Sequence, residues 1–269
     1  MKNVAVIMSV YKNDKPELVR LSVESILHQS YGHFDFYILG DGILNEDVDK
    51  YLSGIDDKRV FYTLRKENKG LAYSLNELLN TVLSKDYEII FRMDADDISL
   101  PQRFEKQLAF LEAHKNIDCA GTWATEINGK GEVFYKKEMP VTHEECYELF
   151  KMRDCFIHPT VAFRRSFFDK AGLYPEDTYF GEDTMMWAMG FANGCRFANI
   201  PEFLFLFRLD EYFFERRRGW KHAKSIFVLR RRVNKLLHYP LSANMYAVVY
   251  SIAKLMPTPV LNLIYQKLR

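Results

Sequence analysis

The chain is 269 residues long, and 48% of its residues are hydrophobic. This composition excludes collagenous, low-complexity and generally disordered proteins, and it predicts one large α/β domain, alone or with an appendage. The four cysteines form no CxxC pair, so neither a zinc knuckle nor a dithiol redox site is indicated. The chain does not open with a secretory pattern, so we expect reduced, mostly buried thiols in a cytoplasmic protein.

Charge divides the chain in two. The formal net charge is +1, but residues 216–269 hold 12 of the 37 basic residues and none of the 36 acidic ones, which leaves residues 1–215 with −11. A division this sharp predicts that the two parts meet different partners. We therefore expect a folded domain at 1–215 and a basic extension at 216–269, which we expect to be helical.

The first ~115 residues alternate between strand and helix patterns. Apolar runs typical of buried strands occur at 4–8, 34–39, 60–64 and 89–91. Helical spacing of apolar residues occurs at 18–27, 71–83 and 101–111. This alternation predicts a doubly wound, mainly parallel sheet, and such sheets bind ligands at the carboxyl ends of their strands.

The pattern after residue 115 is less regular. Gly129-Lys130-Gly131 predicts a hairpin tip, and Thr142 with Glu145 predicts a capping box at the start of a helix. We expect three further elements, namely a strand at 161–163, a helix at 184–192 and a strand at 200–209.

Three carboxylates follow the fourth predicted strand in Asp94-Ala95-Asp96-Asp97. They repel one another unless a positive charge joins them, which makes them a candidate functional site. Carboxylate oxygens suit Mg²⁺ or Mn²⁺ held against the phosphates of a substrate. The alternative is a solvated acidic turn that caps the next helix.

A second acidic pair, Glu182-Asp183, follows Gly181 and precedes a predicted helix. One of these carboxylates could take a proton from an attacking hydroxyl, or both could simply complement the dipole at the start of the helix. His158 is a lone imidazole, more typical of a satisfied loop or core histidine than of a ligand.

Asn68-Lys69-Gly70 precedes the helix predicted at 71–83. Gly70 permits close approach of the backbone to a ligand, and Asn68 is either a helix N-cap or a ligand contact. The sequence has no GxGxxG, GxxxxGK[ST] or GxSxG motif, so a dinucleotide fingerprint, a P-loop and a nucleophile elbow have no support. Phosphoryl transfer by an Asp-rich phosphatase is disfavoured because Ser9-Val10-Tyr11, and not acids, follows the first strand.

The basic extension mixes arginines with aromatic and aliphatic residues. Its longest apolar stretch is about nine residues, well under the ~18–20 that cross a bilayer. This composition predicts a segment that lies on an anionic membrane surface. Nucleic acid is the other natural partner for such charge, but no recognised binding motif accompanies it, so no nucleic-acid partner is expected.

Together these motifs resemble the inverting family-2 glycosyltransferases of the GT-A fold, particularly bacterial enzymes that build O-antigen, capsule or exopolysaccharide. The resemblance covers about residues 1–210, and it implies a nucleotide-binding half at 1–115 and an acceptor-binding half at 116–215. The matches occur in order and are Ser9-Val10-Tyr11, Asp41, Asn68-Lys69-Gly70, Asp94-Ala95-Asp96-Asp97, His158-Pro159, Gly181-Glu182-Asp183 and Phe207-Arg208.

The resemblance implies roles for the matched residues. Asp183, in the ED motif, would be the catalytic base, and Asp96, the second acid of the DxD motif, would hold Mn²⁺ or Mg²⁺ against the diphosphate. Asp94 would contact the nucleotide or the metal. The other nucleotide-sugar contacts would be Val10, Tyr11, Asp41, Asn68 and Gly70. Residues that could contact the acceptor or support the site are Asp97, His158, Glu182 and Arg208.

The implied reaction is a single displacement that inverts the anomeric carbon and forms a β-glycoside. The donor would be a UDP-hexose or UDP-N-acetylhexosamine, and the acceptor a hydroxyl of a polyprenyl-diphosphate-linked saccharide. We expect a cytoplasmic enzyme, peripheral on the inner face of the plasma membrane. The alternative is a non-catalytic, membrane-bound polysaccharide-assembly protein with a degenerate transferase domain.

Two positions depart from the family's pattern. Asp210 stands two residues after Arg208, where many relatives have a histidine, which leaves a third metal ligand open. Gly42 follows Asp41 where many members have further acids or a serine, which leaves the details of base recognition open.

Overall fold

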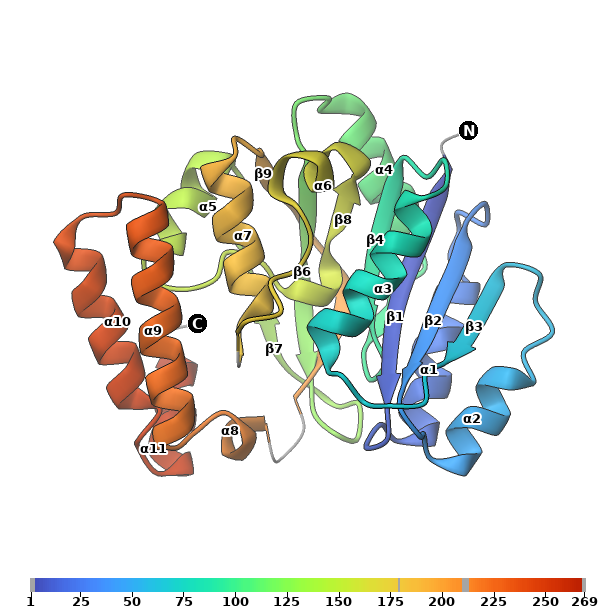
Figure 1. Cartoon of the computed structure of the whole chain (residues 1–269), viewed down its shortest axis with the longest axis horizontal. Coiled ribbons are helices and arrows are strands. Elements are labelled where there is room, and N and C mark those ends of the chain that lie inside the picture. The colour runs from blue at the N-terminus through green and yellow to red at the C-terminus, as the bar shows by residue number, and fades with distance from the viewer. Residues whose placement is uncertain (1–2, 179, 210–212, 268–269) are drawn as a thin grey trace.

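The computed structural model describes residues 3–178, 180–209 and 213–267 (Figure 1). Within them the strands are β1 Val4–Tyr11, β2 Asp35–Asp41, β3 Val60–Leu64, β4 Ile89–Asp94, β5 Ile98–Ser99, β6 Cys119–Ile127, β7 Val133–Lys137, β8 Ala162–Arg164 and β9 Phe197–Arg208. The helices are α1 Pro16–Leu27, α2 Glu46–Ser53, α3 Leu71–Leu83, α4 Arg103–Ala113, α5 His143–Phe150, α6 Arg165–Ala171, α7 Glu182–Ala192, α8 Phe213–Arg216, α9 Trp220–Leu236, α10 Leu241–Ala253 and α11 Thr258–Lys267.

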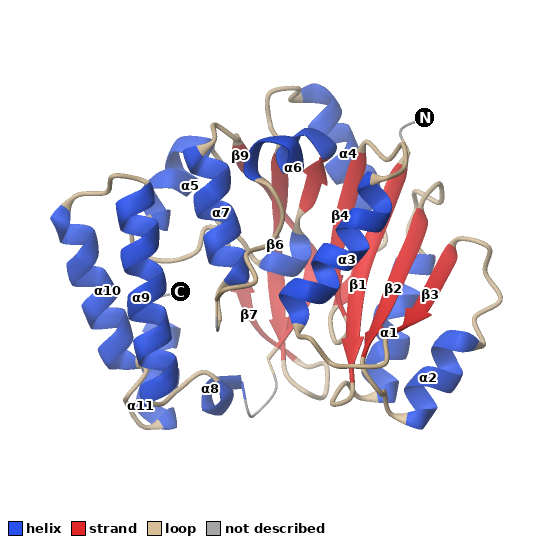
Figure 2. Ribbon diagram, viewed as in Figure 1, coloured by secondary structure: helices blue, strands red, loops and turns tan. Residues whose placement is uncertain are grey.

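The strands of the described residues form one mixed sheet in the order β3-β2-β1-β4-β8-β6-β9-β5, with β7 paired to β6. Strands β3, β2, β1 and β4 are mutually parallel, which confirms the doubly wound half predicted for the first ~115 residues. Beyond β4 the pairing changes, because β8 is antiparallel to both β4 and β6. The sheet is therefore mainly parallel at one end and mixed at the other (Figure 2).

Helices cover both faces of this sheet, and each face has its own hydrophobic core (Figure 2). Helices α1, α2 and α4 pack on one face, and α3, α5, α6 and α7 pack on the other. Strand β1 shows why both layers form. Val4, Val6 and Met8 point into one core, while Ala5 and Ile7 point into the other, as side chains that alternate along a buried strand must.

The elements of the second half agree with the sequence patterns. Strands β6 and β7 form the predicted hairpin around 129–131. Helix α5 has the predicted capping box, in which Thr142 accepts from the Glu145 N–H and the Glu145 side chain accepts from the Thr142 N–H. Strand β9 starts at Phe197, earlier than expected, because parallel pairing with β6 extends back to Cys119. The four cysteines are free and buried, as expected.

The basic extension is helical, as the sequence predicts. Its first long helix, α9, lies beside α7 (Figure 1). The buried side chains of Leu229, Val233 and Leu237 belong to the same core as α7. The first part of the extension is therefore packed into the transferase fold. No helix in the described part of the chain is both long and apolar enough to cross a membrane.

Candidate active site

The carboxyl ends of three parallel strands bring two of the predicted acidic positions to one edge of the sheet. Strand β1 lies between β2 and β4, and its register places Tyr11 beside Asp41 and Ser9 beside Asp94. Val10, which lies between Ser9 and Tyr11 on β1, is fully buried, whereas Tyr11 is 39% exposed. The edge where such sheets bind ligands therefore carries Tyr11, Asp41 and Asp94 together.

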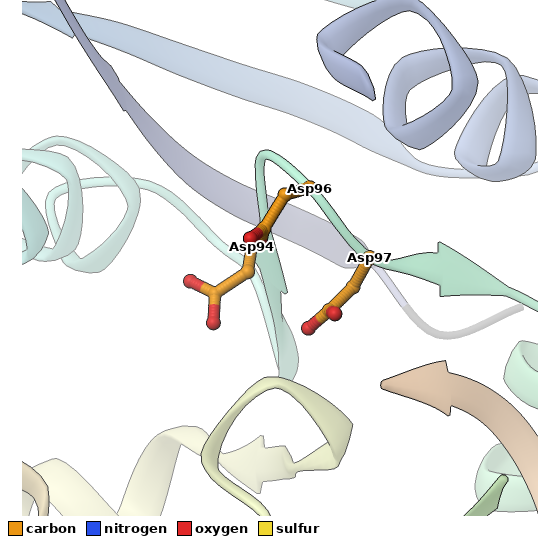
Figure 3. Close-up of side chains that lie close together, drawn as sticks. All are labelled: Asp94, Asp96 and Asp97. Atoms are coloured by element: carbon orange, nitrogen blue, oxygen red, sulfur yellow. The ribbon is translucent and has the colours of Figure 1, made fainter. Parts of the chain in front are cut away.

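The acidic turn after β4 concentrates three carboxylates. One oxygen from each of Asp94, Asp96 and Asp97 lies within 4.8 Å of the others (Figure 3). Burial, followed by the charge of Asp94, raises the pKa of Asp96 to about 6. Burial and the charges of Asp96 and Asp94 raise the pKa of Asp97 well above its ordinary value. The turn thus carries more negative charge than its own surroundings satisfy.

Two arginines and a serine hold this turn in place. Arg208, which is buried, donates its backbone N–H to Asp97 Oδ1 at 2.7 Å and its Nε–H to the Asp96 carbonyl oxygen at 2.7 Å. Arg92, fully buried on β4, forms an ion pair with Asp94. The Ser22 hydroxyl of α1 donates to the Asp94 carbonyl oxygen at 2.7 Å. Arg208 therefore fixes the turn by hydrogen bonds, a role that its place in the resemblance left open.

Asp41 organises the loop before α3. Its carboxylate accepts from the Lys69 and Gly70 backbone N–H groups, both at 2.8 Å, from the Asn68 side chain at 3.1 Å, and from Arg65. The N-cap of α3 is Gly70, so Asn68 is not the cap that the sequence allowed. This loop is fixed by a partly buried network around the buried Asp41 carboxylate, and it lies at the same sheet edge as Tyr11.

Gly42 follows Asp41 for a steric reason. Its φ is +85°, a conformation that favours glycine, and a Cβ there would lie 2.7 Å from the Asn68 backbone nitrogen. An acidic residue or a serine, which many family members have at this position, would push the loop that holds Asn68 away from residue 42. The departure from the family pattern therefore accompanies a close crossing of two backbone segments.

Asp183 lies in the first turn of α7, next to Glu182. Burial, then the charges of Asp154 and Glu182, raises the pKa of Asp183 to about 7, against the opposing effects of the Thr184 N–H and of Arg92. A carboxylate with a pKa near 7 can exchange a proton with a hydroxyl at physiological pH. The electrostatics therefore suit Asp183 to general base chemistry.

Arg92 links the two acidic groups. It pairs with Asp94, its charge acts on Asp97, and it also lowers the pKa of Asp183. Its Nε and Nη1 are buried and have no hydrogen-bond partner among the described residues. Both acidic groups thus lie within electrostatic reach of one buried guanidinium, although Asp94 and Asp183 are far apart in the sequence.

His158 and Tyr174 lie next to this guanidinium. The His158 Nε2 and the Tyr174 hydroxyl are 2.7 Å apart, and the imidazole packs edge-on against Trp187. Burial, followed by the charge of Arg92, lowers the pKa of His158 well below its usual value. A neutral, hydrogen-bonded imidazole agrees with the satisfied histidine favoured by the sequence.

The acidic turn fits a divalent cation. Three carboxylate oxygens crowd there, and Asp97 Oδ2 is buried without a hydrogen-bond partner among the described residues. Such an oxygen is costly unless something positive meets it, and carboxylate oxygens are the ligands that Mg²⁺ and Mn²⁺ prefer. Asp210, where relatives could offer another ligand, lies outside the described residues.

Sequence reasoning missed Arg92, Arg65 and Asp154. Arg92 carried a readable signal, because it is a charged residue inside the apolar run Ile89-Ile90-Phe91-Arg92-Met93. Arg65 and Asp154 occur in no motif, and only the fold brings them to Asp41 and to the vicinity of Asp183.

The fold and the two acidic groups define a GT-A-like glycosyltransferase. The chain belongs to glycosyl transferase family 2, whose profile matches residues 5–172. It is 31% identical, over 97% of both chains, to an uncharacterized glycosyltransferase of Haemophilus influenzae. It is 29% identical to the amylovoran biosynthesis glycosyltransferase AmsE of Erwinia amylovora, over 98% of both chains.

Other similar proteins carry more specific names. The UDP-Gal:alpha-D-GlcNAc-diphosphoundecaprenol beta-1,3-galactosyltransferase of Escherichia coli is 27% identical over 98% of this chain and 95% of its own. Among solved structures, TarS 1–349 of S. aureus with UDP-GlcNAc has a TM-score of 0.63 at 15% identity, covering 97% of this chain and 83% of that one. The mannosyltransferase PcManGT of Pyrobaculum calidifontis, with GDP-Man and Mn²⁺, has a TM-score of 0.61 at 15% identity, covering 98% and 79%. These two structures support the fold.

Proposed function

We propose that this glycosyltransferase moves a hexose or N-acetylhexosamine from a UDP-sugar to a hydroxyl of a polyprenyl-diphosphate-linked saccharide in surface-polysaccharide synthesis. The single observation that carries the proposal is the pairing of two unlike acidic groups around Arg92. One is a crowded trio of carboxylates, and the other is a carboxylate whose pKa is about 7. The names of AmsE and of the E. coli galactosyltransferase favour this pathway and this acceptor class.

The donor is held at the carboxyl edge of the sheet in this proposal. Tyr11 and the Asp41 loop, with Asn68 and Gly70, border the nucleotide. Asp94 and Asp96 would hold Mn²⁺ or Mg²⁺, which when bound offsets negative charge on the departing diphosphate. Arg208 holds Asp96 and Asp97 in position for metal binding through its hydrogen bonds.

Asp183 takes the proton from the acceptor hydroxyl as that hydroxyl attacks the anomeric carbon. With the leaving diphosphate on the opposite side of the sugar, a single displacement inverts the anomeric centre, so an α-linked donor gives a β-glycoside. Arg92 supplies positive charge near both groups and keeps part of the Asp183 population ionised at neutral pH.

Thermal unfolding with nucleotides and metals tests donor binding. We expect UDP with Mn²⁺ to raise the melting temperature, while UDP with EDTA or Mn²⁺ alone raises it little. A screen of UDP-glucose, UDP-galactose and their N-acetyl forms against a synthetic GlcNAc-diphosphate-lipid acceptor then identifies the transfer. Absence of any nucleotide effect, together with no transfer, would favour the non-catalytic assembly protein.

The second part of the proposal concerns the membrane. On α10 one face is buried, through Ala243, Ala247 and Ser251. The opposite face exposes an apolar stripe at helical spacing, formed by Leu241, Met245, Val248, Val249 and Ile252. An exposed apolar stripe in a segment that is strongly basic overall fits a helix lying on an anionic lipid surface. We therefore infer peripheral attachment through this α10 stripe.

Deleting 216–269 should move the protein from the membrane to the soluble fraction. Because the deletion also removes Leu229 and Val233 from the core, substitution of the α10 stripe is the sharper test. We expect Met245→Gln with Val249→Gln to weaken sedimentation with vesicles containing anionic lipid, with little change in the melting temperature. Exposed polar Ser242 provides the matched control, Ser242→Gln, which should bind vesicles as the unmodified protein does. Unchanged binding by the stripe variant would contradict attachment through α10.

A further inference from the structure

Helix α9 packs directly against the turn that presents Asp183. Gly181, just before α7, has φ +84°, and a Cβ there would lie 2.3 Å from Leu229 Cδ2. Leu229 is 4% exposed and shares a core with Trp187 of α7. The glycine that precedes Glu182 and Asp183 therefore lies against α9. The basic extension thus contacts the turn that carries the candidate base.

A chain of hydrogen bonds then joins α9 to Asp183. Arg230, 3% exposed, donates from Nη2 to Asp154 Oδ1 at 2.9 Å and from Nη1 to the Phe150 carbonyl oxygen at 3.1 Å. The same Asp154 oxygen accepts from the Thr184 hydroxyl at 2.9 Å. The Thr184 backbone N–H donates to Asp183 Oδ1 at 2.7 Å.

The charges around Asp183 come from several elements. Glu182 lies on α7 itself, Asp154 follows α5, Arg92 comes from β4, and Tyr174 lies in the segment before α7. After burial, Asp154 is the largest influence that raises the pKa of Asp183. Arg230 is the ion-pair partner of that same Asp154.

We propose that Arg230 and Asp154 are positioning residues for Asp183, which connect the basic extension to the proton acceptor by balancing charge and by holding Thr184. The inference rests on the proposed function of Asp183 as the base. Arg230 offsets the negative charge of Asp154, and Asp154 in turn anchors the residue that hydrogen-bonds Asp183. Neither residue touches the sugar or the leaving group.

This arrangement predicts opposite effects from the two partners. Arg230→Met leaves the Asp154 charge unbalanced, so Asp183 should hold its proton to higher pH. Asp154→Asn removes the neighbouring negative charge and leaves Arg230, so Asp183 should lose its proton at lower pH. The double variant removes both charges and should return the midpoint toward that of the unmodified protein, and Arg230→Lys should change it least.

Carbon-detected NMR of the full chain, labelled with ¹³C in the aspartate carboxyl groups, measures this midpoint without any substrate. The spectrum of Asp183→Asn identifies the Asp183 signal. We expect the midpoint to move up by about half a pH unit or more in Arg230→Met and down by a similar amount in Asp154→Asn. Melting temperatures verify that each variant folds, and the double variant keeps the comparison valid if Arg230→Met alone is unstable.

The same variants are then assayed for transfer from a UDP-hexose found in the donor screen. At pH ~6, Arg230→Met should lose roughly threefold or more in rate, and at pH ~9 less than about twofold. An Asp183 midpoint that is unchanged, or that moves in the same direction in both single variants, overturns the inference. Full transfer by Asp183→Asn would instead overturn the proposed function, so the two failures are distinguishable.

Discussion

The two acidic turns of this protein use the same residue type under different local charge. At the first turn, Arg92 forms an ion pair with Asp94, and Arg208 donates hydrogen bonds to the Asp97 carboxylate from its backbone and to the Asp96 carbonyl oxygen from its side chain, yet three carboxylates outnumber these two arginines. At the second, no arginine among the described residues forms an ion pair with Asp183. Arg92 acts on Asp183 through its charge alone, and Arg230 is joined to Asp183 only through the hydrogen bonds of Asp154 and Thr184.

In the proposed function, this difference separates a cation site from a proton acceptor. A turn with surplus carboxylates and an unmatched buried oxygen is stabilised by a divalent ion. A single, partly buried aspartate with acids as its nearest charged neighbours keeps its proton to near-neutral pH and can therefore accept and release it there. In the proposed function, the position of the arginines distinguishes the two turns more than the number of acids does.

Asp183→Asn offers the strongest way to break this comparison. Asparagine keeps the shape but cannot take a proton, so we expect the transfer rate to fall by about 10²–10⁴-fold. The melting-temperature rise caused by UDP with Mn²⁺ should stay nearly unchanged. Asp86→Asn, an exposed aspartate just before β4 at the opposite end of that strand, is the matched control. Transfer that survives in Asp183→Asn would remove the assignment of the base.

Asp96→Ala tests the other turn. Loss of one carboxylate from the trio should lower kcat/KM about a hundredfold and should remove most of the stabilisation that Mn²⁺ adds to UDP binding. Isothermal titration of UDP with and without Mn²⁺ measures the second effect. A variant whose UDP affinity still depends on Mn²⁺ as strongly as the unmodified protein would show that the cation binds elsewhere.

Gly181→Ala probes the contact that only the second turn makes with α9. The positive φ and the 2.3 Å approach to Leu229 should together cost about 2 kcal/mol of unfolding free energy. Gly129→Ala is the control, because a Cβ there meets nothing within 4 Å, and it should change stability by less than ~0.5 kcal/mol. Urea denaturation compares the two. Equal stability of the two variants would mean that the turn adapts freely to α9.

The pH dependence of stability also tests the charge around the second turn. Asp183 has a folded-state pKa of about 7 against an ordinary value of 3.8. Between these values the folded state holds a proton that the unfolded state has lost, so this group's contribution to stability declines as pH rises from ~4 and levels off above ~7. The unfolding free energy of the unmodified protein, relative to Asp183→Asn, should therefore be lower at pH 8 than at pH 5 in metal-free buffer. Parallel curves for the two proteins would contradict the raised pKa.

The regular half of the fold was predictable because its signals are local. The apolar runs at 4–8 and 89–91 and the helical spacing at 71–83 each determine one element, and the rules for parallel sheets assemble them. The antiparallel pairing of β8 with β4 and β6 could not be predicted in the same way. It depends on contacts between segments that are far apart in the sequence, and no local pattern encodes them.

In the candidate site, too, the sequence predicts local groupings but not contacts between distant segments. Asp94, Asp96 and Asp97 stand together in the sequence, so their clustering could be predicted. Asp154 and Arg230 could not be connected with Asp183, because 76 residues separate the two members of this ion pair. The contact exists only once α9 has packed on α7.

The strand order also constrains how the chain folds during synthesis. Strand β6 is central in the mixed part of the sheet, and its parallel partner β9 begins roughly 80 residues later. At the usual ~5–20 residues per second, the ribosome needs about 4–16 s to synthesise the chain from the start of β6 to the start of β9. During that time β1 to β4 can already pair, while one edge of β6 is left without its partner. We therefore expect a nascent chain of this protein to be most prone to aggregation or chaperone binding after β6 has been synthesised and before β9 has.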